Sequence, residues 1–364
     1  MIKKIVFIGA NSKFKRVFPA ISFFAGLLFD IVTTDRIDQG FTLAQQAIWL
    51  FLIGLILFFK IIDATSPIQF NSSAQKLFER IWSYRFGLIH FLFGGLLSAY
   101  MIFYFKSSSS WISLIFLGII AAVLVANEME RFRKYGLIIQ SVLFSLCLVS
   151  YLAYLFPILV GKLQSWVFYL SILVSVAVVL GFSRLLLRYV QKKSVEREFL
   201  IPAGIVQILF LLFFWFNLIP PVPLSLKSIG IYHKVEREGS VYRAYHENPW
   251  WRFWQSADDH FIAHEGDSIY CFTQIFAPSY FNDKIYLRWY HKDSKQGWVH
   301  WDRIPLNIVG GRSTGYRGYA YKNNYTEGKW QVRIETQDGR EVGRKTFYVQ
   351  KESGTVDIKG FDEF

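Results

Sequence analysis

Before residue 219 the sequence consists mainly of long apolar segments separated by short basic loops. A helix needs about 20 residues to cross a bilayer, and seven segments are long and apolar enough for this role. Because a backbone in hydrocarbon must satisfy its own hydrogen bonds, each segment is predicted to be a helix. The segments are 17–33, 43–62, 86–105, 111–126, 137–160, 165–182 and 199–218.

A proline cluster marks where this pattern ends. The stretch NLIPPVPLSLKSIGIY, residues 217–232, contains Pro220, Pro221 and Pro223. Proline lacks a backbone donor and biases the residue before it to extended conformations, so the cluster ends the last helix. We therefore predict three consecutive parts, which are a cytoplasmic tail (1–16), an all-α transmembrane bundle (17–219) and a Pro-rich junction (220–227).

After the junction, β-branched and aromatic residues alternate with polar ones in short segments, a pattern typical of strands. Strands are expected at 228–235, 240–245, 268–276, 284–291, 298–309, 315–321, 329–336 and 340–349. Asp338-Gly339 lies between the last two and is a two-residue hairpin signal. We predict an all-β antiparallel sandwich of immunoglobulin or fibronectin-III type over 228–350, followed by a flexible tail at 351–364.

The net charge of +13 lies almost entirely in the membrane half, because residues 1–222 carry +11 and residues 223–364 carry +2. A near-neutral second domain argues against nucleic-acid binding. If the N-terminus is cytoplasmic, the basic residues before 222 fall on the cytoplasmic side except Arg36, Lys106 and Lys162. An odd number of spans then places the β domain in the periplasm and the protein in the bacterial inner membrane, in contact with membrane lipids.

The sequence contains few signals for catalysis or metal binding. Cys147 and Cys271 lie on opposite sides of the junction, so they predict neither a disulfide framework nor a thiolate cluster. Six of the seven histidines lie in the β domain, and together with Asp258 and Asp259 they could supply a metal site, but their spacing does not match a metal motif. No nucleophile motif is present. We predict no catalytic residue, no metal and no cofactor, and favour a protein that is not an enzyme.

The β domain is instead rich in aromatic and basic side chains. Aromatic rings with polar neighbours can pack against the C–H faces of sugars, while arginine binds hydroxyl or acidic groups. Two other interpretations stay open. Trp289 and Trp330, in mid-strand, are expected in the core, and PWWRFW (249–254) could rest at the membrane surface. The candidate ligand-binding residues are Trp251, Trp254, Arg288, Tyr290, Arg312, Tyr316 and Arg317.

Ionisable residues in the predicted spans are further candidates, because a charge inside a membrane is costly. Asp30 lies near the outer end of the first segment, with Arg36 and Asp38 just beyond it, and His90 lies near the inner end of the third. The first three could form a clasp on the outer loop. No proton or ion relay can be traced through them.

Four runs in the β domain resemble a known family. They are IYCFTQIFAP (269–278), IYLRWYHKD (285–293), DRIPLNIVGGRSTGYRGY (302–319) and GKWQVRIETQDGREVGRKTFYV (328–349). Together they resemble the bacterial domain-of-unknown-function family twenty-nine fourteen, a module found at the C-terminus of multi-pass membrane proteins. IPPVPLSLKSIGIYH (219–233) and FAGLLFDIVTTDRID (24–38) are also similar to those proteins. The resemblance implies architecture and location, but no catalytic residues.

The sequence therefore predicts a non-catalytic binding protein of the inner membrane. Its sandwich is expected to bind an envelope component, either a glycan or a periplasmic or membrane protein. The competing hypothesis is a transporter or an enzyme acting on a lipid-linked substrate, with the helices as the working part. A polar cavity around Asp30 or His90 would favour that alternative.

Overall fold

The computed structural model describes residues 39–65, 84–108, 136–247, 257–309, 315–353 and 358–364, together with positions 21, 25, 82, 115, 116, 118–120 and 122. The chain divides into two compact units. The first comprises Met1–Phe103, Ile115–Leu155 and Tyr169–Phe216. The second comprises Tyr104–Leu114, Phe156–Phe168 and Asn217–Phe364.

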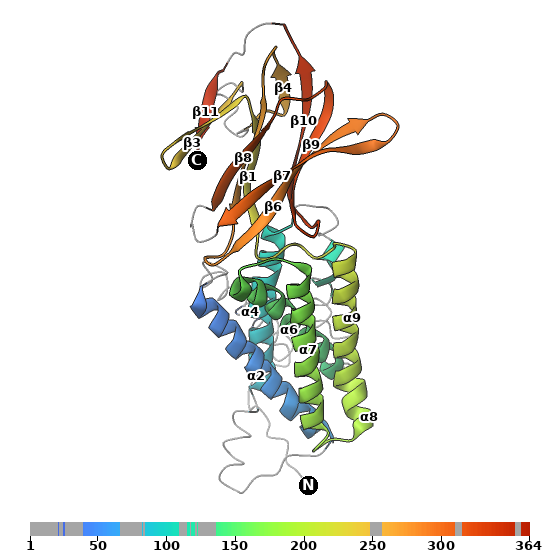
Figure 1. Ribbon diagram of the computed structural model, residues 1–364. Coiled ribbons are helices and arrows are strands. Elements are labelled where there is room, and N and C mark those ends of the chain that lie inside the picture. Colours follow the sequence, from blue (N-terminus) through green and yellow to red (C-terminus); the bar gives the residue numbers. More distant parts are fainter. Residues whose placement is uncertain are drawn as a thin grey trace. The chain divides into compact units, whose positions relative to one another are not determined.

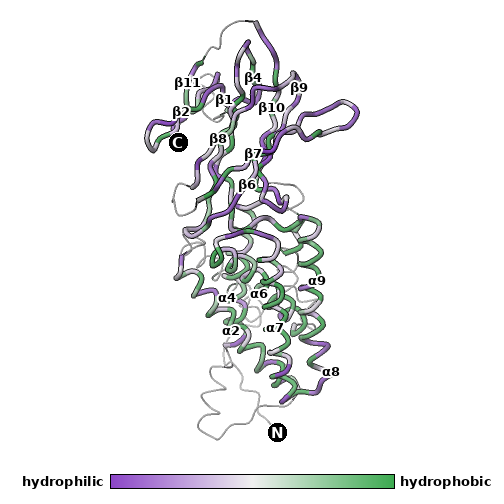
Figure 2. Tube along the Cα trace, viewed as in Figure 1, coloured by the Kyte–Doolittle hydropathy of each residue, from purple (hydrophilic) through white to green (hydrophobic). Residues whose placement is uncertain are grey.

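Long apolar helices form the first half of the chain. Within the described residues, five helical segments are long and apolar enough to cross a membrane. They are α2 (Gly40–Thr65), α4 (Arg85–Lys106), α6 (Gly136–Val160), α7 (Ser165–Leu186) and the continuous run Lys192–Trp215, which contains α8 (Lys192–Val195), the π-helical turn η2 (Glu196–Leu200) and α9 (Ile201–Trp215). In Figure 2 these helices are mostly hydrophobic, whereas hydrophobic and hydrophilic positions alternate in the strands.

These helices confirm the predictions at 43–62, 86–105, 137–160, 165–182 and 199–218. The predicted span 17–33 and most of 111–126 lie outside the described residues. The last helix begins earlier than predicted, because helical hydrogen bonding continues through the polar residues 192–198, where hydropathy gives no signal. An ion pair of 3.6 Å between Lys192 Nζ and Glu196 Oε1, one turn apart, accompanies this extension.

Polar side chains join the helices inside the first unit. Ser145 Oγ donates a hydrogen bond of 3.0 Å to the carbonyl oxygen of Ala203, and Gln207 Nε2 donates one of 3.0 Å to Ser175 Oγ. In hydrocarbon such groups have no water to bind, so they pair across helices. Such hydrogen bonds between helices are typical of a packed helical bundle.

The second unit is built from three sheets (Figure 1). The first contains, in spatial order, β1 (Ser225–Tyr232), β5 (Ile269–Phe276) and β8 (Tyr316–Lys322). The second contains β4 (His260–Ala263), β10 (Glu341–Lys351), β9 (Gly328–Thr336), β6 (Asn282–Asp293) and β7 (Gly297–Val309). The third contains β11 (Gly360–Glu363), β3 (Val241–His246) and β2 (Lys234–Glu238).

The first two sheets share one hydrophobic core. Trp289 of β6 and Trp330 of β9 are fully buried in it, as the sequence predicted, and Ile231 and Cys271 enter it from the first sheet. Because alternate residues of a strand point to opposite faces, the intervening residues of β6 and β9 form the outer face of the second sheet. This outer face carries the candidate site.

The strand pattern departs from prediction in four places. The predicted strand 228–235 is split, since β1 and β2 belong to different sheets and the chain changes sheet at His233. β4 and β11 were not predicted, because four residues are too few to display a period of two. β4 pairs with β10 in parallel, whereas all pairs were expected to be antiparallel.

Two predicted boundaries also need correction. β1 begins at Ser225, inside the predicted junction 220–227. The predicted flexible tail 351–364 ends in β11, which pairs antiparallel with β3 and places the Phe364 ring 4.4 Å from that of Phe272. The tail is polar in composition, but backbone pairing and further contacts of Phe361 with Tyr245 and of Asp362 with Tyr232 order its end.

The loop between α6 and α7, residues 161–164, belongs to the second unit. The sequence pattern instead predicts that it belongs to the helical domain. Leu163 is 4% exposed and lies in the sandwich core. Its backbone N–H donates a hydrogen bond of 2.8 Å to Asp283 Oδ2, and the Asn282 N–H donates one of 2.8 Å to the Gly161 carbonyl oxygen. Ser165 Oγ donates a further bond of 3.0 Å to Asp338 Oδ2. The α6–α7 loop is therefore a structural part of the sandwich.

Candidate ligand-binding face

Four arginines lie side by side across the outer face of the second sheet. Arg288 of β6 pairs in register with Arg303 of β7 on one side and with Arg333 of β9 on the other. Arg333 is in turn the register partner of Arg344 of β10. We call these four residues the arginine row. Like charges directly opposite each other destabilise a sheet, so the row lowers the stability of the fold.

Two carboxylates balance part of this charge. Glu335, whose side chain is 7% exposed, lies 3.0 Å from Arg288 Nε, and Glu341 accepts two hydrogen bonds of 2.6 Å from Arg344. Burial raises the pKa of Glu335, and the nearby Arg288 and Arg333 oppose that rise. Within the described part of the chain, Arg303 and Arg333 have no carboxylate at ion-pair distance. Arg303 at one end of the row and Arg333 inside it therefore keep a positive charge that no described carboxylate neutralises.

Aromatic rings lie against these two arginines. The Arg303 guanidinium carbon is 3.6 Å from the centroid of the Tyr286 ring, and that of Arg333 is 4.3 Å from the Tyr290 ring. Such cation–π contacts use the face of each guanidinium group and leave its edge, which carries the N–H groups, for hydrogen bonds. Arg333 Nε already donates one of 2.6 Å to Gln331 Oε1. Tyr290 also donates a hydrogen bond of 3.3 Å to Glu335 Oε1. The face thus presents ordered guanidinium groups flanked by flat rings.

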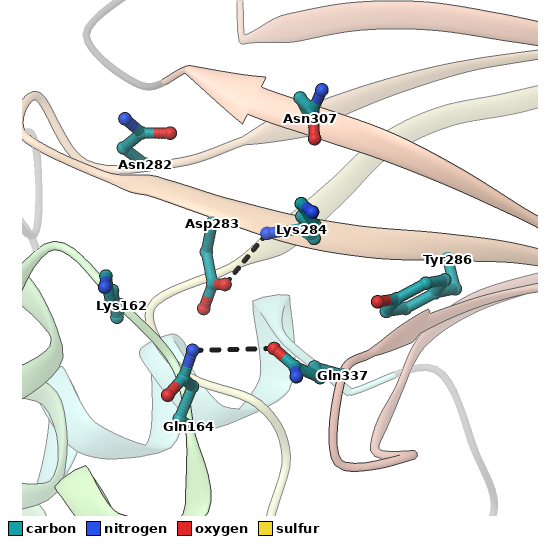
Figure 3. Close-up of a pocket in the computed structure, with 8 residues that line it drawn as sticks. All are labelled: Lys162, Gln164, Asn282, Asp283, Lys284, Tyr286, Asn307 and Gln337. Carbon is teal, nitrogen blue, oxygen red and sulfur yellow. Dashed lines mark hydrogen bonds between the residues drawn. The ribbon is translucent and has the colours of Figure 1, made fainter.

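A polar pocket of about 400 Å³ adjoins this face at Tyr286 (Figure 3). Both carboxylate oxygens of Asp283 are occupied, because Oδ2 accepts from the Leu163 N–H and Oδ1 accepts at 2.8 Å from the Lys284 N–H. Gln164 Nε2 donates a hydrogen bond of 3.5 Å to Gln337 Oε1, so the lysines and the two asparagines are the groups best placed to contact a ligand. The pocket is lined by Lys162 and Gln164 of the α6–α7 loop, by Asn282, Asp283, Lys284 and Tyr286 of β6, by Asn307 of β7 and by Gln337 after β9.

The structure brings together only some of the predicted ligand-binding residues. Arg288 and Tyr290 lie on this face. Tyr316 packs against the core from the first sheet, and Arg317 Nη1 donates a hydrogen bond of 3.0 Å to the Ser240 carbonyl oxygen, so this pair is not part of the row. The other three candidates, Trp251, Trp254 and Arg312, lie outside the described residues.

Sequence reasoning missed Arg303, Arg333 and Arg344. A signal was present for the last two, since a two-residue turn at Asp338-Gly339 would place Arg333 opposite Arg344. The structure has this pair, but the turn is longer, with Glu335 opposite Glu341, and a bulge between Glu341 and Gly343 restores the register. The pairing of β6 with β7 and with β9 has no comparable short-range signal. The row could therefore not be assembled without the sheet order.

The predicted membrane candidates remain separate from this face. His90 is 8% exposed in α4, and its Nδ1 lies 2.6 Å from the Phe86 carbonyl oxygen one turn earlier. This contact satisfies a buried polar atom within its own helix. Asp30, Arg36 and Asp38 lie outside the described residues, so the predicted clasp stays a prediction.

Five described helical segments that could span a membrane, followed by a β-rich region, indicate a membrane protein with a β-sheet domain after its helices. Residues 282–349, which contain β6 to β9 and most of β10, match the family described as Protein of unknown function (DUF2914). This match confirms the family resemblance of the β domain and includes the whole arginine row. A comparison with curated proteins gave no match.

Proposed function

We propose that the protein is a multi-pass protein of the bacterial inner membrane whose β domain binds an acidic glycan of the cell envelope without converting it. Seven helices, an N-terminus in the cytoplasm and an immunoglobulin-like sandwich in the periplasm complete this proposal. The helical segments of the first unit and the distribution of basic residues between them support the membrane part.

The arginine row is the observation that carries the binding proposal. Its like charges reduce the stability of the sheet, and an anionic ligand that bridges them would reverse this effect. Arg303 and Arg333 lie on Tyr286 and Tyr290, so their orientation is fixed before binding. Preorganised donors lose less entropy on binding.

The surroundings of the row favour a glycan over an apolar partner surface. Tyr286 and Tyr290 are half-buried rings beside polar groups, and the adjoining pocket is lined by lysines, amides and a phenol. Sugars need both flat rings and hydrogen-bonding groups, whereas acidic substituents need cations. Carboxylates and phosphates on an envelope glycan would satisfy the row.

The test uses the full chain in detergent, incubated with peptidoglycan sacculi, with bead-bound lipopolysaccharide and with neutral dextran beads. We expect retention on an acidic glycan and not on dextran, with retention falling as salt rises. The double variant Arg288→Gln/Arg333→Gln should bind about tenfold more weakly or worse, because each lost charge-assisted hydrogen bond costs about 1.5–3 kcal/mol.

A matched variant removes two cations elsewhere on the same sheet. Lys292 and Lys295 are exposed in the β6–β7 hairpin and lie outside the row, so Lys292→Gln/Lys295→Gln should bind like the wild type. Equal binding by the row variant and the wild type would refute the role of the row. If the wild type is retained by neither acidic glycan, the binding proposal fails. The helical bundle then becomes the better candidate for the domain that carries the function.

A further inference from the structure

A second polar cluster lies inside the β domain, away from the arginine row. His233 is at its centre, with a side chain only 3% exposed. Its Nε2 lies 3.8 Å from Glu247 Oε1 and 3.9 Å from Asp258 Oδ2, while its Nδ1 lies 3.7 Å from Asp267 Oδ2. His264 Nε2 approaches the same Glu247 oxygen at 4.0 Å. Two imidazoles and three carboxylates thus surround one small volume.

The His233 ring has no hydrogen-bond partner among the described residues, at either nitrogen. Its distances to the three carboxylates are too long for hydrogen bonds. A buried polar group without a partner costs about 1–3 kcal/mol, and native structures rarely leave one in that state. The Phe261 ring, stacked at 4.1 Å, holds the imidazole in this orientation. The gaps of 3.8 and 3.9 Å between Nε2 and the carboxylate oxygens are therefore wide enough for a bound cation to lie between these atoms.

We propose that His233, His264, Glu247 and Asp258 bind a zinc ion, and that Asp267 orients His233 through Nδ1. Two neutral imidazoles and two carboxylates are a donor set that suits Zn²⁺. Metal-bound histidines commonly give their other ring nitrogen to a carboxylate, which is the position of Asp267. Mg²⁺ and Ca²⁺ prefer sites built from oxygen alone.

The centre is open in this conformation. Among the described residues, no group of three or more His, Cys, Asp and Glu side chains is arranged as it stands to hold a metal ion. Ligand atoms around a tetrahedral zinc ion lie about 3.4 Å from one another, given bonds of about 2.0–2.1 Å. The nitrogen–oxygen distances of 3.8, 3.9 and 4.0 Å exceed that value by roughly half an ångström. Small rotations of these side chains would close the centre.

The four ligands come from the places where all three sheets meet. His233 joins β1 to β2, Glu247 follows β3, and His264 follows β4. Asp258 is anchored to the first sheet, because its backbone N–H donates a hydrogen bond of 3.1 Å to the Ile231 carbonyl oxygen. A zinc ion here would cross-link the sheets and stabilise the domain by mass action.

The test uses the full chain purified in detergent with an affinity tag that contains no histidine. After chelation and dialysis, zinc is titrated by calorimetry, and the bound metal per chain and the thermal unfolding midpoint are measured. We expect one zinc per chain and a higher midpoint. His233→Gln and His264→Gln should abolish both effects, and Asp267→Asn should weaken zinc binding about 10- to 100-fold.

His260→Gln is the matched control, because this histidine lies in β4 near the cluster in sequence but contacts the Tyr348 ring instead. It should bind zinc like the wild type. If the His233 variant does not fold, the His264 variant decides, since its side chain lies at the edge of the cluster and is 10% exposed. Absence of a zinc-dependent rise in the wild-type midpoint, or unchanged affinity in the His264 variant, would overturn the proposal.

Discussion

At the scale of single residues, Asp258 and His233 show how burial shifts the pKa of a charged group. The pKa of Asp258 is raised to about 7, mainly by burial and in part by the charges of Glu247 and Asp259, while a backbone hydrogen bond from Glu247 and the charge of Lys345 oppose the rise. Burial lowers the pKa of His233 to about 4, against the attraction of Asp267. In the absence of metal, the folded protein therefore favours the neutral form of both side chains.

These opposite shifts predict how stability depends on pH. The unfolded Asp258 titrates near 3.8, so its contribution to stability is present at low pH and is lost as pH rises through about 7. The contribution of neutral His233 is lost instead as pH falls below 6.5 towards about 4. Asp258→Asn removes only the first dependence.

We therefore expect the Asp258→Asn variant, in the presence of a chelator, to gain thermal stability over the wild type as pH rises from 5 to 8. One pKa unit corresponds to about 1.4 kcal/mol, so a gain of at least that size is expected at pH 8. The measurement is the unfolding midpoint of the full chain in detergent. A difference between variant and wild type that does not change with pH would contradict the assignment.

At the scale of elements, the α6–α7 loop supplies a core residue to a domain that begins more than fifty residues later in the chain. Leu163→Ala should lower the stability of the sandwich by about 2 kcal/mol or more, since it leaves a cavity among buried side chains. Hydrogen exchange of peptides from β6 and β9, measured by mass spectrometry on the full chain, reports this loss as faster exchange.

The neighbouring Lys162 is exposed, so Lys162→Ala provides the control and should leave exchange unchanged. If exchange in β6 and β9 were equally slow in both variants, Leu163 would not be part of the cooperative core.

The elements with a long repeating pattern were predictable from the sequence. Apolar segments of about 20 residues and strands of seven or more residues repeat their period often enough to be recognised. β4, β11 and the sheet change at His233 were not, because each depends on pairing with a strand distant in the chain. The Leu163 contact was missed for a related reason, since an apolar residue in a loop between helices gives no sign that it fills a sheet core.

For the candidate site, the sequence predicted the types of residue but not their arrangement. Aromatic and basic side chains pointed to the β domain, and two of the predicted candidates, Arg288 and Tyr290, lie on one face of β6, where their role in ligand binding stays a prediction. The row itself depends on the register of four strands, and the zinc-binding cluster depends on the meeting of three sheets. Neither arrangement is encoded in local spacing.

At the scale of the whole molecule, the proposed orientation can be tested with single cysteines. The native Cys147 and Cys271 are both buried, so a new surface cysteine can be labelled selectively. A membrane-impermeant maleimide applied to cells with a permeabilised outer membrane should label Lys329→Cys in β9. It should label Lys192→Cys, whose native side chain is 78% exposed in α8, only after the inner membrane is disrupted. The reverse pattern would place the β domain in the cytoplasm.

The position of Leu163 has a consequence for biosynthesis. The ribosome completes α6, α7 and the loop between them before it has made any strand of the sandwich. Leu163 is therefore present before the strands that pack against it are synthesised. A fragment that starts at the proline cluster would lack Leu163 and would therefore have a cavity in the sandwich core. It would also lose the hydrogen bonds that residues 161–165 make with Asn282, Asp283 and Asp338. The strands alone should therefore fold less stably than the same strands in the full chain.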